Sequence, residues 1–184
     1  MKSLVLFFLA FAFSLNIFAD TISDKEKNAL IKLYHATNGG QWKTKWDLSL
    51  SAATWNGVET DNGKVVGLNL ANNNLQGKLP VELLDLVNLV QVDLHKNRLQ
   101  GELPLEIGRL SKLEVLSLFD NQIQGDLPGS IYKLINLKVL LLNNNKFSGS
   151  LSKEIINYGA LQNLSLFDNN FEGEFRLKLK SCII

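Results

Sequence analysis

The stretch NNNLQGKLP, Asn72 to Pro80, recurs with small changes along the chain. The later copies are KNRLQGELP from Lys96, DNQIQGDLP from Asp120, NNNKFSGSLS from Asn143 and DNNFEGEF from Asp168. None of these copies contains a pattern typical of a catalytic site. The repetition itself therefore has to be explained first.

Five asparagines fall into one column at a spacing of 24 residues: Asn73, Asn97, Asn121, Asn145 and Asn169. Apolar residues keep the same phase, as in the column Leu70, Leu94, Leu118, Leu142 and Leu166. Because one short coil cannot bury its own apolar face, this pattern predicts coils stacked into a solenoid. We expect the Asn column to be structural, since an amide both donates to and accepts from the backbone where the chain leaves a strand.

The pattern L-x-x-L-x-L-x-x-N-x-L within each period is the signature of leucine-rich repeats. Its LxGxLP ending resembles the plant-type leucine-rich repeat over residues 65–176. The resemblance implies an α/β repeat solenoid, a right-handed coil of five turns with a parallel concave β-sheet and a second short strand in each coil. The proline of the ending is replaced by Ser152 and Arg176 in the last two coils, which we expect to be less regular on that side.

Residues 20–64 are predicted to form a helical, Trp-rich cap on the first coil. Ser23-Asp24-Lys25-Glu26 has the pattern of a capping box, and Thr37-Asn38-Gly39-Gly40 should end the helix. All three tryptophans of the chain follow, and we expect them to fill the core of the cap: Trp42, Trp46 and Trp55.

The cap also carries a resemblance of its own. The motifs LYHATNGGQW and WNGV are similar to the cysteine-free caps of exported bacterial leucine-rich-repeat proteins. The caps of plant extracellular leucine-rich-repeat proteins instead hold a cysteine pair, where this chain has Ala53 and Thr60.

The two termini lie outside the repeats. Lys2, the apolar run LVLFFLAFAFSL and Ala19 predict a signal peptide over residues 1–19, because the run is too short to span a bilayer. The mature chain is then expected to be secreted or at the cell surface, or periplasmic if the chain is bacterial. Residues 177–184 are predicted to be a C-terminal tail or a partial cap.

Composition excludes several classes of function. Loss of Lys2 with the signal peptide leaves 18 of the 19 basic residues against 18 acidic ones, a balance that disfavours a nucleic-acid partner. Cys182 is the only cysteine, and His35 and His95 are the only histidines, so no zinc-ligand spacing is present. We expect no metal and no cofactor, and the sequence predicts no particular oligomeric state.

Side chains that alternate with the apolar columns should form the concave face, the outward surface of the parallel sheet. Phe119 and Phe167 stand out, because outward aromatic residues have no role in the core. With apolar neighbours and a polar rim they predict a surface that binds a protein or a peptide. Its candidate residues are Gln91, Asp93, His95, Val115, Ser117, Phe119, Asp120, Val139, Leu141, Asn143, Phe167 and Asp168.

Three other functions are conceivable for this surface and its cap. Asp93, His95 and Ser117 resemble a catalytic triad by composition only, since no nucleophile turn is present and an open sheet excludes little water. A glycan-binding module would use Trp42 or Trp46. A purely adhesive or structural module would have no ligand of its own.

Overall fold

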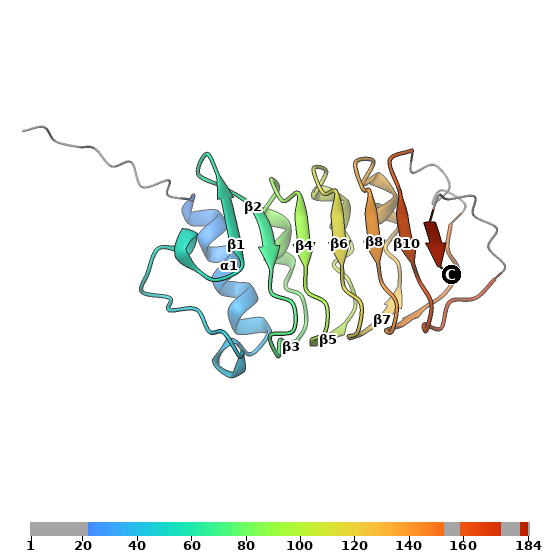
Figure 1. Cartoon of the computed structure of the whole chain (residues 1–184), viewed down its shortest axis with the longest axis horizontal. Helices are drawn as coiled ribbons and strands as arrows, with labels where there is room; N and C mark the ends of the chain where they lie inside the picture. The colour runs from blue at the N-terminus through green and yellow to red at the C-terminus, as the bar shows by residue number, and fades with distance from the viewer. Residues whose placement is uncertain (1–21, 153–158, 174–180, 184) are drawn as a thin grey trace, which may run out of the picture.

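The computed structural model describes residues 22–152, 159–173 and 181–183. The predicted signal peptide lies outside this range, as do Ile155, Phe175, Arg176, Leu177, Leu179 and the side chain of Cys182. The described chain is an elongated stack of coils with a helix, α1 (Asp24–Ala36), at one end (Figure 1).

A seven-stranded sheet runs along the whole stack in the order β1-β2-β4-β6-β8-β10-β11 (Figure 1). Its strands are β1 (Val58–Asp61), β2 (Lys64–Asn69), β4 (Gln91–Asp93), β6 (Val115–Ser117), β8 (Val139–Leu141), β10 (Asn163–Ser165) and β11 (Ser181–Ile183). Only β1 is antiparallel to its neighbour; every other pair is parallel. From β2 to β10 each residue pairs with the residue 24 positions later, such as Gln91 with Val115, so the sequence period becomes the register of the sheet.

The opposite side of the coils contains a second sheet and short 3₁₀ segments. The second sheet is formed by β3 (Gln76–Gly77), β5 (Arg98–Gly101), β7 (Gln122–Asp126) and β9 (Lys146–Ser148). The 3₁₀ segments η3 (Val81–Asp85), η4 (Ile107–Arg109) and η5 (Gly129–Lys133) then lead back to the large sheet. Two more, η1 (Gly39–Gln41) and η2 (Ala52–Thr54), belong to the cap.

The second sheet confirms the plant-type interpretation of the LxGxLP ending. The repeated glycine of this ending has a φ between 70° and 133° in every coil, a region that side chains with a Cβ avoid. Within the described residues the fifth coil adds only an isolated bridge between Ser150 and Glu172. The fourth coil keeps strand β9 although Ser152 replaces its proline, so among the described residues the less regular side is seen in the fifth coil alone.

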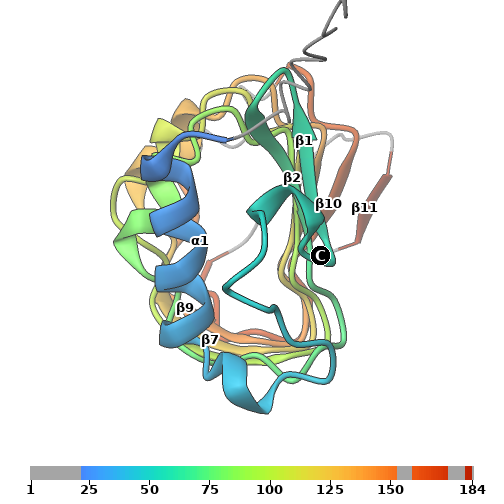
Figure 2. The same cartoon turned by 90° about the vertical axis from the view of Figure 1, so that its left-hand side faces the viewer.

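The core lies between the large sheet and the 3₁₀ segments and consists of the aligned apolar columns (Figure 2). Leu118 and its counterparts in the other four coils are at most 4% exposed, and the column of Leu116 is at most 2% exposed. Viewed end-on, the coils enclose this core with the large sheet on one side and the 3₁₀ segments on the other (Figure 2).

The asparagine column satisfies the backbone at the turn after each sheet strand. In the third coil the Nδ2 of Asn121 donates to the carbonyl oxygens of Leu94, Leu118 and Phe119, at 2.9 to 3.3 Å. Its Oδ1 accepts the backbone N–H of Leu99 at 3.0 Å. One amide therefore joins its own turn to the preceding coil.

The pattern is the same in the neighbouring coils, with Asn97, Asn145 and Asn169 bonded in the same way. Asn73 is buried and instead exchanges two hydrogen bonds with the backbone of Thr44 in the cap. The ladder therefore bonds to backbone groups in all five coils, and its four later members are partly buried rather than fully buried.

The cap helix begins at the predicted capping box. Ser23 Oγ accepts the N–H of Glu26, and Glu26 Oε2 accepts the N–H of Ser23, both at 3.3 Å. Glu26 Oε1 also accepts the N–H of Val65 in β2 at 3.1 Å, and the residue is only 4% exposed. The carboxylate that caps the helix thus ties the cap to the first coil.

The three tryptophans fill the cap core, as expected. Trp42, Trp46 and Trp55 are 2 to 4% exposed, and the Trp46 ring lies 4.9 Å from that of Trp42 and 4.8 Å from that of Trp55. Each indole N–H donates to a backbone carbonyl oxygen at 2.8 to 3.0 Å. Neither Trp42 nor Trp46 offers a free ring face, so the suggestion that they stack on a glycan is wrong.

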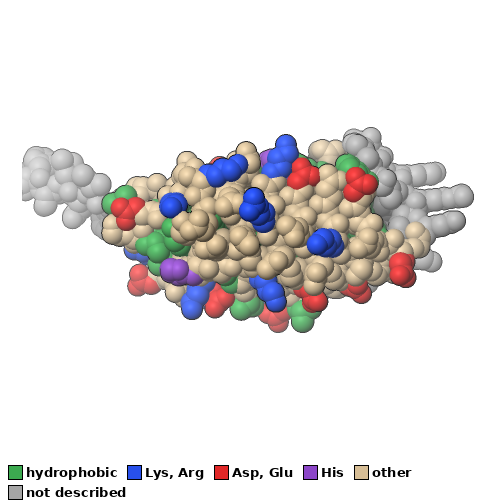
Figure 3. All heavy atoms as spheres, turned by 90° about the horizontal axis from the view of Figure 1, so that it is seen from below, with side chains coloured by type: hydrophobic (Ala, Val, Ile, Leu, Met, Phe, Trp, Pro, Cys, Tyr) green, Lys and Arg blue, Asp and Glu red, His purple; other side chains and the backbone are tan. Residues whose placement is uncertain are grey.

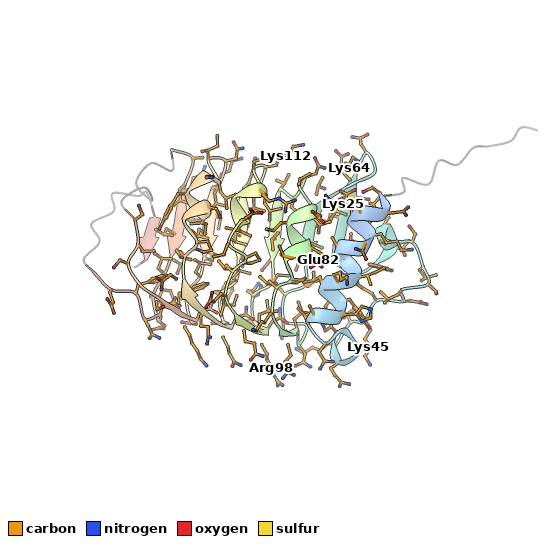
Figure 4. All side chains as sticks on the ribbon, turned by 180° about the vertical axis from the view of Figure 1, so that it is seen from behind. Lys25, Lys45, Lys64, Glu82, Arg98 and Lys112 are labelled. Carbon is orange, nitrogen blue, oxygen red and sulfur yellow. The ribbon has the colours of Figure 1, made fainter. Side chains whose placement is uncertain are left out.

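An ion-pair cluster connects α1 to the 3₁₀ segments η3 and η4. Asp85 Oδ1 lies 3.1 Å from both Lys25 Nζ and Arg109 Nη2. Lys25 and Glu82 are seen on neighbouring α1 and η3 in Figure 4. The hydrogen bond from Lys25, and less strongly that from Arg109, holds the pKa of Asp85 below its ordinary value of 3.8, although partial burial opposes this.

We predict that Asn121→Ala lowers the free energy of unfolding by about 2 to 4 kcal/mol, because backbone groups of two coils lose their partner. Urea denaturation followed by circular dichroism measures the change. Gln122→Ala, which truncates the exposed neighbouring side chain, is the control. Equal stability of the two variants would contradict the role of the ladder.

We predict that Asp85→Asn lowers the melting temperature at pH 6 but not at acid pH. The pKa of Asp85 is lowered in the folded state, so its contribution is present above 3.8 and is lost as the pH falls through the lowered folded value. For a surface cluster we expect up to about 1 kcal/mol, or about 2 to 4 °C. Melting curves from pH 2 to 7 measure it, and Glu82→Gln on η3 is the control. A difference between wild type and Asp85→Asn that persists at pH 2 would argue against this pairing.

Candidate functional site

The concave face is formed by alternate side chains of β4, β6, β8 and β10 and by the residues that follow these strands. Most of the predicted binding residues do lie partly exposed on this surface. They are Gln91, Asp93, His95, Val115, Phe119, Asp120, Val139, Leu141 and Phe167, and Asp168 is more exposed than these. The parallel register places equivalent residues of successive coils side by side.

His95 and Phe119 form an aromatic pair across two coils. Their ring centroids are 4.3 Å apart and the planes differ by 10°, which is a stacked arrangement. Asp93 Oδ1 lies 2.6 Å from His95 Nδ1, so the imidazole is held from its other side as well. Both rings are therefore positioned before any ligand arrives.

An apolar strip continues from this pair along the sheet. We define the concave strip as Val115, Phe119, Val139, Leu141 and Phe167. Val115 pairs directly with Val139, and Leu141 lies between two serines of the neighbouring strands, Ser117 and Ser165. Each strip residue keeps part of its surface exposed to solvent.

Ser117 and Asn143 correct the predicted site. Both were expected to point outward into a ligand, but they are only 4% and 9% exposed. Ser117 is a short side chain next to the bulkier Leu141, and Asn143 lies between Phe119 and Phe167 in the same column. Short side chains in these columns are covered by longer neighbours, which alternation along a strand does not reveal.

The buried Asn143 separates the two aromatic residues of the concave strip, Phe119 and Phe167. Phe119 and Phe167 follow strands that are two positions apart in the sheet, so they are separated by roughly 10 Å. Asn143 occupies the coil between them and leaves little side chain exposed. Phe119 and Phe167 therefore flank a polar residue that exposes little of its side chain.

The backbone conformation at Asp120 and Asp168 favours the residue types found there. The residue before each ladder asparagine has a φ of 52° to 55° in all five coils. This left-handed conformation favours Asn, Asp and Gly. The acidic rim is therefore set in part by the turn, a constraint that the sequence analysis missed although the column Asn72, Lys96, Asp120, Asn144, Asp168 carried its signal.

The catalytic and metal alternatives find no support in the geometry. Ser117 is buried, and within the described chain it makes no side-chain hydrogen bond to His95. Among the same residues no three His, Cys, Asp or Glu side chains gather closely enough to hold a metal ion. No described helix has the length and apolar character needed to cross a membrane.

Comparison with known proteins places these coils in a family. The family model for the Leucine Rich Repeat matches residues 64–86, 88–110, 112–134 and 136–158, which together make up half of the chain. No curated protein gave a significant sequence match. The resemblance of the cap to bacterial caps stays a prediction.

Among solved structures, the BIR2 ectodomain from Arabidopsis thaliana is 26% identical, with a TM-score of 0.73. The match covers 83% of this chain and 84% of that one. The ectodomain of the plant membrane receptor kinase GASSHO1/SCHENGEN3 from Arabidopsis thaliana, in complex with CASPARIAN STRIP INTEGRITY FACTOR 2, is 27% identical with a TM-score of 0.75. There the match covers 81% of this chain but only 19% of the receptor chain.

A third match is the plant peptide hormone receptor RGFR1 in complex with RGF2, which is 39% identical over 66% of this chain and 19% of the receptor, with a TM-score of 0.61. The fold that these ectodomains share is a non-enzymatic scaffold for ligand binding. The chain belongs to the leucine-rich-repeat family, with repeats of the plant type.

Proposed function

We propose that this chain is an exported leucine-rich-repeat module that binds a peptide or an extended protein segment on its concave face. In this proposal residues 1–19 are a signal peptide, residues 20–64 the cap, residues 65–176 the five coils and residues 177–184 a tail or partial cap. Lys2, the apolar run and Ala19 support export to the extracellular space or the cell surface.

The observation that carries the proposal is the stack of His95 on Phe119 beside a partly exposed apolar strip. An aromatic side chain that is already held in one rotamer loses little conformational entropy on binding. Val139 and Leu141 extend the apolar area to the next strand, and Asp93 and Asp168 add polar groups at its margin. Aromatic anchors with a polar rim are typical of protein-binding surfaces.

The relatives support a peptide or protein as the ligand class. The solved structures of GASSHO1/SCHENGEN3 and RGFR1 are complexes with CASPARIAN STRIP INTEGRITY FACTOR 2 and RGF2, respectively. This chain spans about a fifth of the length of each of those receptor chains, so only the binding role of the shared coils is carried over. A polysaccharide ligand has less support, because the tryptophans that would stack on sugar rings are buried.

We predict that Phe119→Ser combined with Phe167→Ser weakens binding of selected peptides by about thirtyfold or more, because one buried aromatic anchor contributes about 2 kcal/mol and the variant removes two. Peptides are first selected from a displayed library on the wild-type protein. Their dissociation constants are then measured by isothermal titration, and extracellular fluid is used for a parallel pull-down.

The matched control replaces two exposed apolar residues away from the concave face, Leu105→Ser with Ile135→Ser. Both double variants are first shown to melt within a few degrees of the wild type. If Phe119→Ser with Phe167→Ser binds the same peptides and recovers the same partners as the control, the module is structural and the proposed face is wrong.

A further inference from the structure

A small pocket lies where the cap meets the first two coils, at the end of the strands of the large sheet. Its volume is about 170 Å³, and it is lined by Lys43, Asn72, Asn74, Lys96, Asn97 and Arg98. Lys43 belongs to the cap, Asn72 and Asn74 to the first coil, and the other three residues to the second. We call it the cap-edge pocket.

The cap-edge pocket is positively charged. Lys43, Lys96 and Arg98 contribute three cations, and no acidic residue lines the pocket. Figure 3 looks at this edge from below and shows Lys and Arg side chains over the turns, and Arg98 lies at the same edge in Figure 4. Two acids lie beside the pocket: Asp93 is bonded to His95, and Asp120, the counterpart of Lys96 in the next coil, accepts a hydrogen bond from Asn144 Nδ2.

The cations keep donors free for a ligand. Lys43 Nζ donates to Asn72 Oδ1 at 2.6 Å, which directs one ammonium group toward the pocket lining. Within the described part of the chain, the side chains of Lys96 and Arg98 form no hydrogen bond and no ion pair. A guanidinium group presents paired N–H donors that match the oxygens of an anion.

Lys96 is an exception to the rule of its own column. The four equivalent residues are Asn72, Asp120, Asn144 and Asp168, types that tolerate the left-handed conformation. Lys96 has a φ of 54° there, and its side chain has no partner in the described chain that would offset the strain. Residues held in such a conformation cluster at binding and catalytic sites.

The pocket continues the concave strip. Lys96 directly follows His95, whose ring stacks on Phe119, so a ligand that crosses the strip reaches the pocket at the cap end. From these observations we propose that the cap-edge pocket binds a compact anionic group, a carboxylate or a sulfate, of the ligand on the concave face. The inference rests on the proposed function and adds to it the charge and the direction of the ligand.

The free-anion test uses sodium sulfate and sodium acetate as probes at constant ionic strength. Amide shifts of ¹⁵N-labelled protein are followed by NMR, and we expect saturating shifts at residues 72–74 and 96–98. Lys96→Asn with Arg98→Gln should weaken sulfate binding by about tenfold, as for the loss of charged hydrogen bonds. Both replacements occur naturally at the same positions of neighbouring coils, at Asn72 and Gln122, so the fold should be retained.

The control variant is Lys64→Gln with Lys146→Gln, which removes two exposed cations elsewhere and should change sulfate binding by less than about twofold, as screened surface charges do. Phe119→Ser with Phe167→Ser should leave sulfate binding intact. The experiment therefore distinguishes a wrong assignment of the peptide-binding face from a wrong assignment of the anion pocket. Anion binding in the cap-edge pocket would be rejected if the wild type showed no localised shifts. It would also be rejected if Lys96→Asn with Arg98→Gln bound sulfate as well as the wild type does.

The source of the anion is tested with the peptides selected above. We expect an acidic group in most of them, and about tenfold weaker binding when that group is amidated or removed. This loss should be smaller, at most about threefold, on Lys96→Asn with Arg98→Gln, which keeps only Lys43 of the three cations. If selected peptides carry no acidic group and bind both proteins equally, the pocket takes free ions only, and the inference about the ligand is rejected.

Discussion

Each coil leaves the large sheet through a left-handed turn, and one asparagine amide meets the backbone groups that this turn leaves without partners. The Nδ2 of Asn121 donates to carbonyl oxygens of its own turn and of the preceding coil, while Oδ1 accepts an N–H from β5. A buried backbone group without a partner costs as much as a lost hydrogen bond. The 24-residue spacing and the in-register sheet both depend on this repeated contact, because an insertion in one coil would displace the amide from its neighbour.

The ladder needs a partner at its first member, and the cap provides it. Asn73 bonds to the backbone of Thr44, and Glu26 accepts the N–H of Val65 while it caps α1. Two polar contacts thus connect the buried tryptophan cluster to the first coil. No cysteine is available in this cap, so packing and hydrogen bonds take the place that a disulfide has in plant-type caps.

The stacked coils fix the positions of the side chains on the concave face. The strands fix the positions of Val115, Val139 and Leu141, and Asp93 and Phe119 hold the ring of His95 from two sides. Such a surface enters a complex with little loss of conformational entropy. The cap-edge pocket adds charge at one end, where the strained Lys96 departs from the Asn and Asp of its column. In this proposal the concave strip provides apolar contact, and the cap-edge pocket provides positive charge at one end of the same face.

The repeat itself determined most of the fold. A period of 24 residues sets the register directly, since each coil is the same local structure displaced by one strand spacing. The inward columns, the asparagine ladder, the capping box and the second strand of each coil all follow from patterns that are local in sequence. These features could be predicted because their partners lie at a constant offset along the chain.

Tertiary structure decided how the outward side chains fit one another. Alternation along a strand separates inside from outside, but it does not show that Leu141 or Phe119 covers a shorter neighbour, and so it missed the burial of Ser117 and Asn143. The stack of His95 on Phe119 depends on rotamers in two coils. The approach of Lys43 to Lys96 and Arg98 depends on how the cap docks, and the cap has no periodic relation to the coils. The sequence by itself determined the coils and their inward columns, whereas the binding surface was decided by packing between residues that no fixed spacing connects.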